Sequence, residues 1–192
     1  MKICVYGASS NSIDKAFINH GVELGKVMGN RGHDLVFGGG DSGLMGAVAR
    51  GIFETGGKIY GVAPEFFNAD GILFENCTEL IRTKTMRERK QTMEDLADGF
   101  IMTPGGIGTF EEFFEILTLR QLMQTAKPIA VLNTLGYYDA LQSMMENGIT
   151  NKFFTEKTME LYKVFDSPDA CVDYIENYIA TDGKIQDFKD IK

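Results

Sequence analysis

The sequence predicts an α/β fold, a doubly wound and mostly parallel sheet of about six or seven strands flanked by helices. Short continuous apolar runs alternate along the chain with longer segments of helical periodicity, and such runs are typical of strands covered on both faces. Hydrophobic residues make up 44% of the 192 positions, and no repeat, linker or low-complexity stretch divides them. We therefore expect a single domain over residues 1–192, with residues 181–192 as a polar tail.

The expected strands are apolar runs that end at a glycine, a proline or a polar residue. They cover residues 3–7, 35–37, 58–63, 78–82, 99–103, 128–133 and 161–165. Helical spacing fills the intervals, and residues 64–76 are expected as a loop or short helix. The expected helices cover residues 13–28, 85–98, 107–124, 137–147 and 168–180, and another runs from the glycine-rich stretch at 38–46 to about residue 55. Thr85 and Glu88 are spaced as a capping box, Gly56-Gly57 ends the second helix, and Pro168 suits the start of the last.

Charge and cysteine content narrow the classes of function. The net charge of −8 argues against non-specific binding to nucleic acid or anionic membranes, so an anion site has to be local. The three cysteines, Cys4, Cys77 and Cys171, fit no zinc pattern and suit a reducing cytoplasm. No apolar run approaches the roughly 20 residues that cross a bilayer. His20 and His33 have no ligand at metal-binding spacing, so no metal is expected.

The strongest motif is the stretch from Thr103 to Glu112, where a strand, a glycine-rich turn and a helix follow one another. Gly105, Gly106 and Gly108 allow the backbone to approach a ligand closely, and the new helix directs its free N–H groups there. A phosphate is the natural occupant. Glu111 and Glu112 are expected in the first helical turn, where they indicate either chemistry near the phosphate or a simple helix-terminal charge.

A second glycine-rich loop, Gly38-Gly39-Gly40-Asp41-Ser42-Gly43, matches the dinucleotide fingerprint, and Glu65 lies near the expected position of its ribose-binding acid. The loop follows the second strand, after a complete βα unit, which argues against a dinucleotide. Two glycine loops could instead share one monophosphate, or could simply form tight turns. Asp41 and Ser42 are candidates for contacts to ribose or phosphate, or for turn formation.

A basic cluster, Met86-Arg87-Glu88-Arg89-Lys90, opens the helix expected at 85–98. Helical pitch places Met86, Arg89 and Lys90 on one side and Arg87 elsewhere. These cations either reach the carboxyl edge of the sheet, to bind phosphate or orient a carboxylate, or form a solvated helix face.

Taken together, the motifs resemble those of the LONELY GUY family, the cytokinin riboside 5′-monophosphate phosphoribohydrolases once described as lysine decarboxylases. The likeness runs from Lys2 to about Asn147. It rests on Gly38-Gly39-Gly40-Asp41-Ser42-Gly43-Leu44-Met45-Gly46, Met86-x-x-Arg89-Lys90 and Pro104-Gly105-Gly106-x-Gly108-Thr109-x-x-Glu112.

The resemblance implies a Rossmann-like fold, a homodimer with sites near its interface, and hydrolysis of a nucleoside 5′-monophosphate to base and ribose 5-phosphate. It implies no cofactor, pyridoxal phosphate included. The family's catalytic pair falls on Arg89 and Glu112, with Glu115 as a helper one turn on. The expected substrate-binding residues are Ser9, Gly39, Gly40, Gly43, Leu44, Met45, Gly46, Met86, Lys90, Gly105, Gly106, Gly108, Thr109 and Glu115.

The sequence departs from the family pattern at Leu119 and Met123, where members often carry Trp and Gly, so the preferred base stays open between adenine and an N6-substituted adenine. Two other functions are weighed beside hydrolysis. One is a carrier of nucleotide or molybdenum cofactor, which does not need the Arg89–Glu112 pair. The other is a dinucleotide-dependent oxidoreductase, for which no segment is left to build a second substrate surface.

Overall fold

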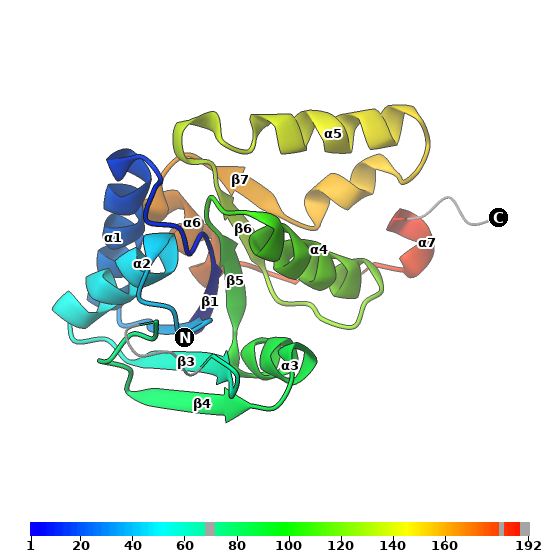
Figure 1. Cartoon of the computed structure of the whole chain (residues 1–192). Coiled ribbons are helices and arrows are strands. Elements are labelled where there is room, and N and C mark those ends of the chain that lie inside the picture. The colour runs from blue at the N-terminus through cyan, green and yellow to red at the C-terminus, as the bar shows by residue number, and fades with distance from the viewer. Residues whose placement is uncertain (68–71, 181–182, 189–192) are drawn as a thin grey trace.

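The computed structural model describes residues 1–67, 72–180 and 183–188. Its strands form one seven-stranded sheet in the order β4-β3-β2-β1-β5-β6-β7, and each pair of neighbours is parallel (Figure 1). The strands are β1 (Lys2–Tyr6), β2 (Asp34–Phe37), β3 (Ile59–Pro64), β4 (Glu79–Thr83), β5 (Gly99–Met102), β6 (Ile129–Leu132) and β7 (Lys163–Phe165). The predicted fold class is confirmed.

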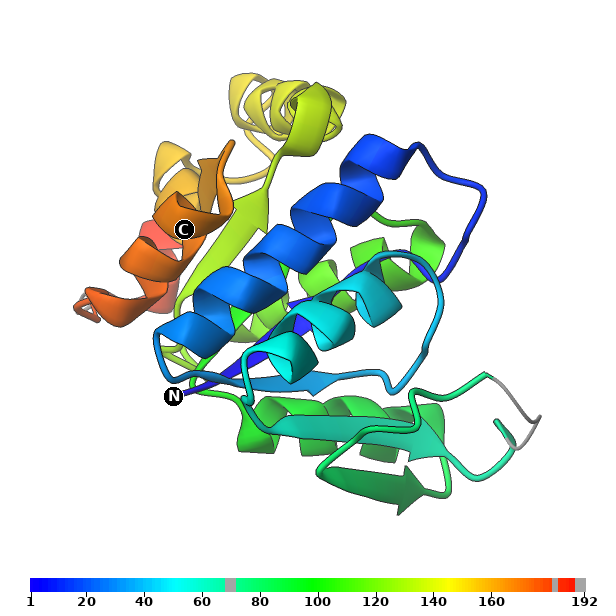
Figure 2. The ribbon, with the colours of Figure 1, turned by 90° about the vertical axis from the view of Figure 1, so that its left-hand side faces the viewer.

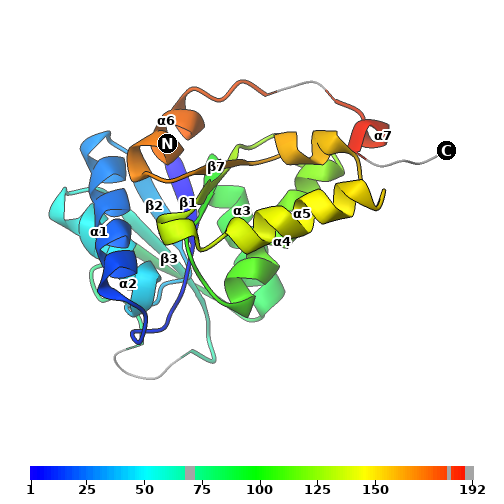
Figure 3. The same ribbon diagram turned by 90° about the horizontal axis from the view of Figure 1, so that it is seen from above.

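Helices cover both faces of this sheet, and side chains alternate between the two faces along each strand. Ile3 and Val5 of β1 pack with the first group of helices, whereas Cys4 and Tyr6 pack with the second. Figures 2 and 3 show the two groups on opposite sides of the sheet. The first group is α1 (Lys15–Asn30), α2 (Gly43–Glu54) and α6 (Pro168–Glu176). The second is α3 (Met86–Leu96), α4 (Ile107–Gln121), α5 (Asp139–Thr150) and α7 (Ile185–Phe188).

Helix ends follow local chemistry closely. The capping box predicted at α3 is present, with the Thr85 side chain accepting from the Glu88 amide and the Glu88 carboxylate accepting from the Thr85 amide. Helix α4 ends at Gln121, before the predicted 124, because Met123 adopts a left-handed conformation with φ of 58°. Two 3₁₀ turns that the sequence did not indicate, η1 (Thr134–Gly136) and η2 (Glu156–Glu160), flank α5.

The prediction that residues 181–192 form a frayed polar tail is wrong for residues 185–188. This segment forms α7, and the Phe188 ring is 7% exposed against the core of the α3–α4 face. The Phe188 carbonyl also accepts from the Thr158 hydroxyl at 3.3 Å. One buried aromatic therefore docks a segment whose composition is otherwise polar. Residues 181–182 and 189–192 lie outside the described residues.

Throughout residues 1–67, 72–180 and 183–188, none of the helices combines the length and the apolar character needed to span a membrane.

Candidate active site

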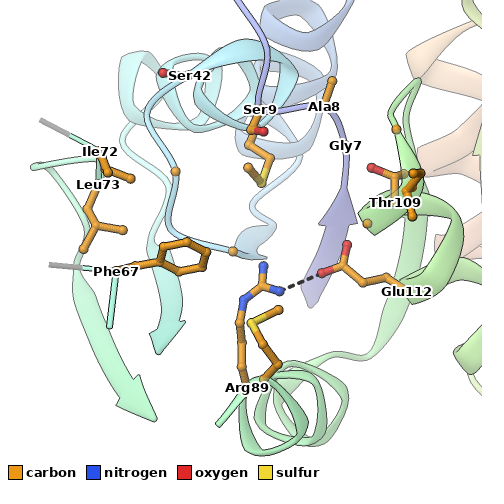
Figure 4. Close-up of a pocket in the computed structure, with 17 residues that line it drawn as sticks. Gly7, Ala8, Ser9, Ser42, Phe67, Ile72, Leu73, Arg89, Thr109 and Glu112 are labelled. Atoms are coloured by element: carbon orange, nitrogen blue, oxygen red, sulfur yellow. Dashed lines mark hydrogen bonds and ion pairs between the residues drawn. The ribbon is translucent and has the colours of Figure 1, made fainter. Parts of the chain in front are cut away.

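The candidate site lies where the strand order reverses, between β1 and β5. The loop after β1 and the loop after β5 meet there, since the Ala8 amide donates to the Pro104 carbonyl at 3.1 Å. A cavity of about 530 Å³ opens beside this contact, within the size range of small-molecule sites. Figure 4 shows side chains from both halves of the sheet pointing into it.

Arg89 and Glu112 both line this cavity and meet at one side of it (Figure 4). The Arg89 Nη1 donates to Glu112 Oε1 at 2.9 Å, and its Nε donates to the Val62 carbonyl at 3.1 Å. Arg89 is only 8% exposed, so this cation belongs to the site and the alternative of a solvated helix face is wrong for it. Two fixed hydrogen bonds hold the guanidinium, and the guanidinium in turn orients the carboxylate.

Burial raises the pKa of Glu112 above its ordinary value, and the nearby Arg89 charge partly offsets this. Glu111 and Glu112 lie in the second turn of α4, because the helix begins at Ile107. The prediction that both occupy the first turn is therefore wrong. Glu112 lines the cavity as an acid that is hydrogen-bonded to Arg89. Its position is therefore not explained as a simple charge at the end of the helix.

Gly38 explains how the guanidinium fits. A Cβ atom at this position would lie 2.0 Å from Arg89 Nη2, well inside any allowed contact. The residue lines the cavity immediately after β2, where the backbone passes beneath the arginine. Glycine is required here by the close approach of the Arg89 side chain.

We expect Gly38→Ala to displace the Arg89 guanidinium and to lower turnover by about 10- to 100-fold, because small misplacements of catalytic groups are costly. Thermal stability should fall as well, because displacing this buried guanidinium weakens its hydrogen bonds to Glu112 and to the Val62 carbonyl. Steady-state kinetics and a melting curve on the same preparation measure both quantities. Wild-type turnover in this variant would contradict the stated role of Gly38.

The start of α4 is the part of the cavity best suited to an anion. Its N-cap is Gly106, and no side chain caps the first amides of the helix. Two tyrosine hydroxyls hold the loop from behind, with Tyr137 donating to the Gly105 carbonyl and Tyr138 to the Thr103 carbonyl, each at 2.7 Å. The loop is thus held rigid while its amide groups stay available to a phosphate.

The other glycine-rich loop is different, because protein groups already engage its amides. The Gly43 amide donates to Asn11 Oδ1 at 2.8 Å, and the Met45 amide donates to the Ala8 carbonyl at 3.2 Å. The Asp41 amide donates to the Ile72 carbonyl at 2.9 Å. These three amides are therefore already engaged within the protein, unlike the first amides of α4.

Most of the predicted site residues line the cavity, and the others lie in the core, in the supporting loops or in a neighbouring groove. The predicted residues that line the cavity are Ser9, Gly40, Met45, Met86, Arg89, Gly106, Gly108, Thr109 and Glu112. Those that do not are Gly39, Gly43, Leu44, Gly46, Lys90, Gly105 and Glu115. Leu44 is buried in the core, and Lys90 and Glu115 face a separate groove between α3 and α4. Gly105 supports the loop from behind, packed against the Thr109 side chain.

Ser42, a candidate for contact to ribose or phosphate, also lines the cavity. Sequence reasoning missed other lining residues, namely Gly7, Ala8, Gly38, Phe67, Ile72, Leu73 and Ile107. Phe67, Ile72 and Leu73 lie on the side of the cavity opposite Thr109 (Figure 4). Pairing of the Gly39–Asp41 backbone with residues 72–74 brings them there. The exposed aromatic at Phe67 was the only signal in the sequence, because pairing between distant segments leaves no local pattern.

Two expectations about specificity change with the structure. Leu119 packs on the core and lines the groove between α3 and α4, and Met123 follows the end of α4, so neither lines this cavity. Glu65, the acid proposed for a dinucleotide ribose, does not line it either. Gly38 and Gly40 of the fingerprint loop do line the cavity, but without the ribose-binding acid they do not complete a dinucleotide site.

Comparison with known proteins agrees with this geometry. The family described as "Possible lysine decarboxylase" matches residues 45–175. The chain is 36% identical to the cytokinin riboside 5′-monophosphate phosphoribohydrolase LOG of Oryza sativa subsp. japonica over 88% of this chain and 69% of that protein. It is 33% identical to the corresponding enzyme LOG1 of Arabidopsis thaliana over 96% of this chain and 86% of that protein.

Among solved structures, the molybdenum cofactor binding protein of Rippkaea orientalis aligns with a TM-score of 0.70 at 19% identity, covering 91% of this chain and 94% of that one. This likeness shows the fold alone. The matched family and the identity to the plant enzymes settle the relationship that the motifs and the Arg89–Glu112 geometry indicated. The chain belongs to the LONELY GUY family of proteins, which carries the older description "Possible lysine decarboxylase".

Proposed function

We propose that this protein hydrolyses the N-glycosidic bond of a nucleoside 5′-monophosphate, either AMP or an N6-substituted, cytokinin-type relative. The products are the free base and ribose 5-phosphate. The curated relatives in rice and Arabidopsis carry the name of this activity. The observation that carries the proposal is the buried Arg89–Glu112 pair, which faces the same cavity as the uncapped start of α4.

The polarity of the cavity suits a nucleotide lying across it. At one end are the amides of Gly106 to Thr109, which suit the phosphate. At the other end are Phe67 and Leu73, which suit the flat apolar face of a base (Figure 4). The acid–cation pair lies between these ends, where the ribose and its bond to the base would sit.

Cleavage of an N-glycosidic bond builds positive charge on the ribose ring, as in glycoside hydrolysis. The Glu112 carboxylate stabilises that charge and orients the attacking water. The oxygen of the water bonds to C1′ as the bond from C1′ to the base nitrogen breaks. The electron pair of that bond leaves with the base, and a proton from the water passes to the base. Arg89 keeps Glu112 ionised and correctly placed, while the bound phosphate supplies positioning energy remote from the breaking bond.

The test is a chromatographic assay of purified protein with AMP, its N6-isopentenyl analogue and the two matching nucleosides. Free base released from the monophosphates, and much less from the nucleosides, is the expected result. The faster of the two monophosphates identifies the preferred base. Binding of a monophosphate without release of base would instead favour the carrier function.

We also propose that the protein works as a homodimer in the cytoplasm, with its sites near the interface. Ile107 and Leu135 are 88% and 73% exposed, on two segments joined by the hydrogen bond from Tyr137 to Gly105. Large apolar side chains exposed this close to a site suit contact with a second copy. Light scattering after gel filtration measures the mass in solution, and a monomer at assay concentration would contradict the dimer.

A further inference from the structure

A second set of ion pairs lies beside the candidate active site, in the groove between α3 and α4. Lys90 of α3 forms an ion pair with Glu111 of α4, and its Nζ lies 2.9 Å from Glu115 Oε2. The Lys90 side chain is 16% exposed, whereas the two carboxylates are about half exposed. One largely buried cation thus serves two acids on the helix that carries Glu112.

The two sets of ion pairs run side by side between the same helices. Arg89 and Lys90 are consecutive on α3, and their partners Glu112 and Glu111 are consecutive on α4. Consecutive residues of a helix point about 100° apart, so Arg89 turns into the cavity and Lys90 into the groove. The sequence motif places Lys90 with the substrate-binding residues, but within the described residues its ion pairs are with carboxylates of α4.

We propose that Lys90 is a positioning residue that keeps Glu112 ionised and in place by neutralising the acidic turn of α4. This inference rests on the proposed hydrolysis, since it concerns how the catalytic acid of that reaction is maintained. Lys90 does not touch the substrate and acts through Glu111, Glu115 and its own charge.

The charges around Glu112 support this role. From α3, Arg89 and Lys90 both lower the pKa of Glu112, while from α4 the neighbouring Glu111 raises it. From β1, Cys4 and Tyr6 face the same carboxylate, and burial raises the pKa of both, so they stay uncharged at ordinary pH. Removing the Lys90 charge therefore takes away one of two cations and leaves Glu111 uncompensated, and both changes favour protonation of Glu112.

The experiment compares the pH dependence of kcat/KM in wild type, Lys90→Met and Lys90→Arg. Activity needs ionised Glu112, so the rate falls as the pH drops through the pKa of this acid. In Lys90→Met we expect this fall in rate, the acid limb of the profile, to occur at a pH about 1 unit higher. At any pH on the limb, kcat/KM should therefore be about tenfold lower than in wild type. The plateau at higher pH should stay close to wild type. Lys90→Arg keeps the charge and should keep the wild-type profile.

Arg87→Met is the matched control, because Arg87 is an exposed cation of the same helix and groove that forms no ion pair among the described residues. Its acid limb should stay in place. The double variant Lys90→Met/Glu111→Gln removes the uncompensated acid as well, and its limb should return toward wild type. A merely structural role for Lys90 would lower the whole profile without shifting it, and would not predict this rescue.

An unshifted acid limb in Lys90→Met would overturn the inference even if activity fell. If wild type itself releases no base, the proposed function fails, and the inference is tested separately by following the Glu112 carboxyl carbon in a pH titration by NMR. An upward shift of the Glu112 pKa in folded Lys90→Met then supports the inference, and an equal pKa in the two proteins overturns it.

Discussion

Glu112→Gln should lower turnover by about 10²- to 10³-fold, or about 3 to 4 kcal/mol of transition-state stabilisation. The amide has the size of the carboxylate but lacks its charge, so it cannot stabilise positive charge on the ribose. The amide oxygen can still accept the hydrogen bond from Arg89. In the wild-type structure this bond joins Arg89 Nη1 to Glu112 Oε1 at 2.9 Å. The fold should therefore be kept, although the melting temperature should fall because the buried Arg89 loses its charged partner. Release of base measured at substrate saturation should fall sharply.

The pH profile gives this prediction a second measurement. Because burial raises the pKa of Glu112, the acid limb of the wild-type profile should lie above the ordinary glutamate range. Glu112→Gln has no group to titrate at this position, so its residual rate should lose that limb. Glu111→Gln, one residue away and facing the groove, is the control and should keep turnover at neutral pH. Unchanged turnover in Glu112→Gln would remove this residue from the mechanism.

Arg89→Ala should lose activity at neutral pH and also destabilise the fold, by about 3 to 5 kcal/mol, because it leaves Glu112 buried without its cation. Glu112 then responds by taking up a proton, which removes the charge that the reaction needs. Kinetics at neutral pH and chemical denaturation measure the two effects. A wild-type rate would remove Arg89 from the mechanism and leave it as a structural partner of Glu112.

The stability loss in Arg89→Ala should depend on pH in a definite direction. Without its partner, Glu112 has a folded-state pKa raised even further above the unfolded value. Such a group destabilises the fold above its folded pKa, and this cost disappears as the pH falls below the unfolded pKa. The gap in stability from wild type should therefore narrow in acid. Arg89→Ala/Glu112→Gln should recover stability at neutral pH but not activity, which separates the two effects.

Lys90 shows what helical periodicity cannot predict. The pitch of α3 correctly placed Met86 and Arg89 on one side, and both line the cavity. It placed Lys90 with them, yet Lys90 faces the groove. Periodicity describes how side chains are spaced around one helix, whereas the direction each one takes depends on which neighbour lies opposite. That neighbour is α4, and its place is set by packing of both helices on the sheet.

The two glycine-rich loops also differ in a way that their sequences do not show. Both read alike in the sequence, as glycines between a strand and a helix. In the structure, Asn11 and the Ala8 carbonyl occupy amides at the start of α2, while the first amides of α4 have no side-chain cap. The difference comes from the loop after β1, which lies more than 30 positions away along the chain. No local pattern encodes which helix start another segment will cover.

The doubly wound parallel sheet and the order of its elements could be predicted from the chain alone, because continuous apolar strands, helical periodicity and glycine-rich turns are local properties. The motifs indicated the family, and the resemblance singled out Arg89 and Glu112 as a pair. The burial and contact of this pair, the groove position of Lys90 and the docking of Phe188 became evident from the folded structure. These depend on contacts between distant segments, whose free energy exists only once the sheet and its helices have packed.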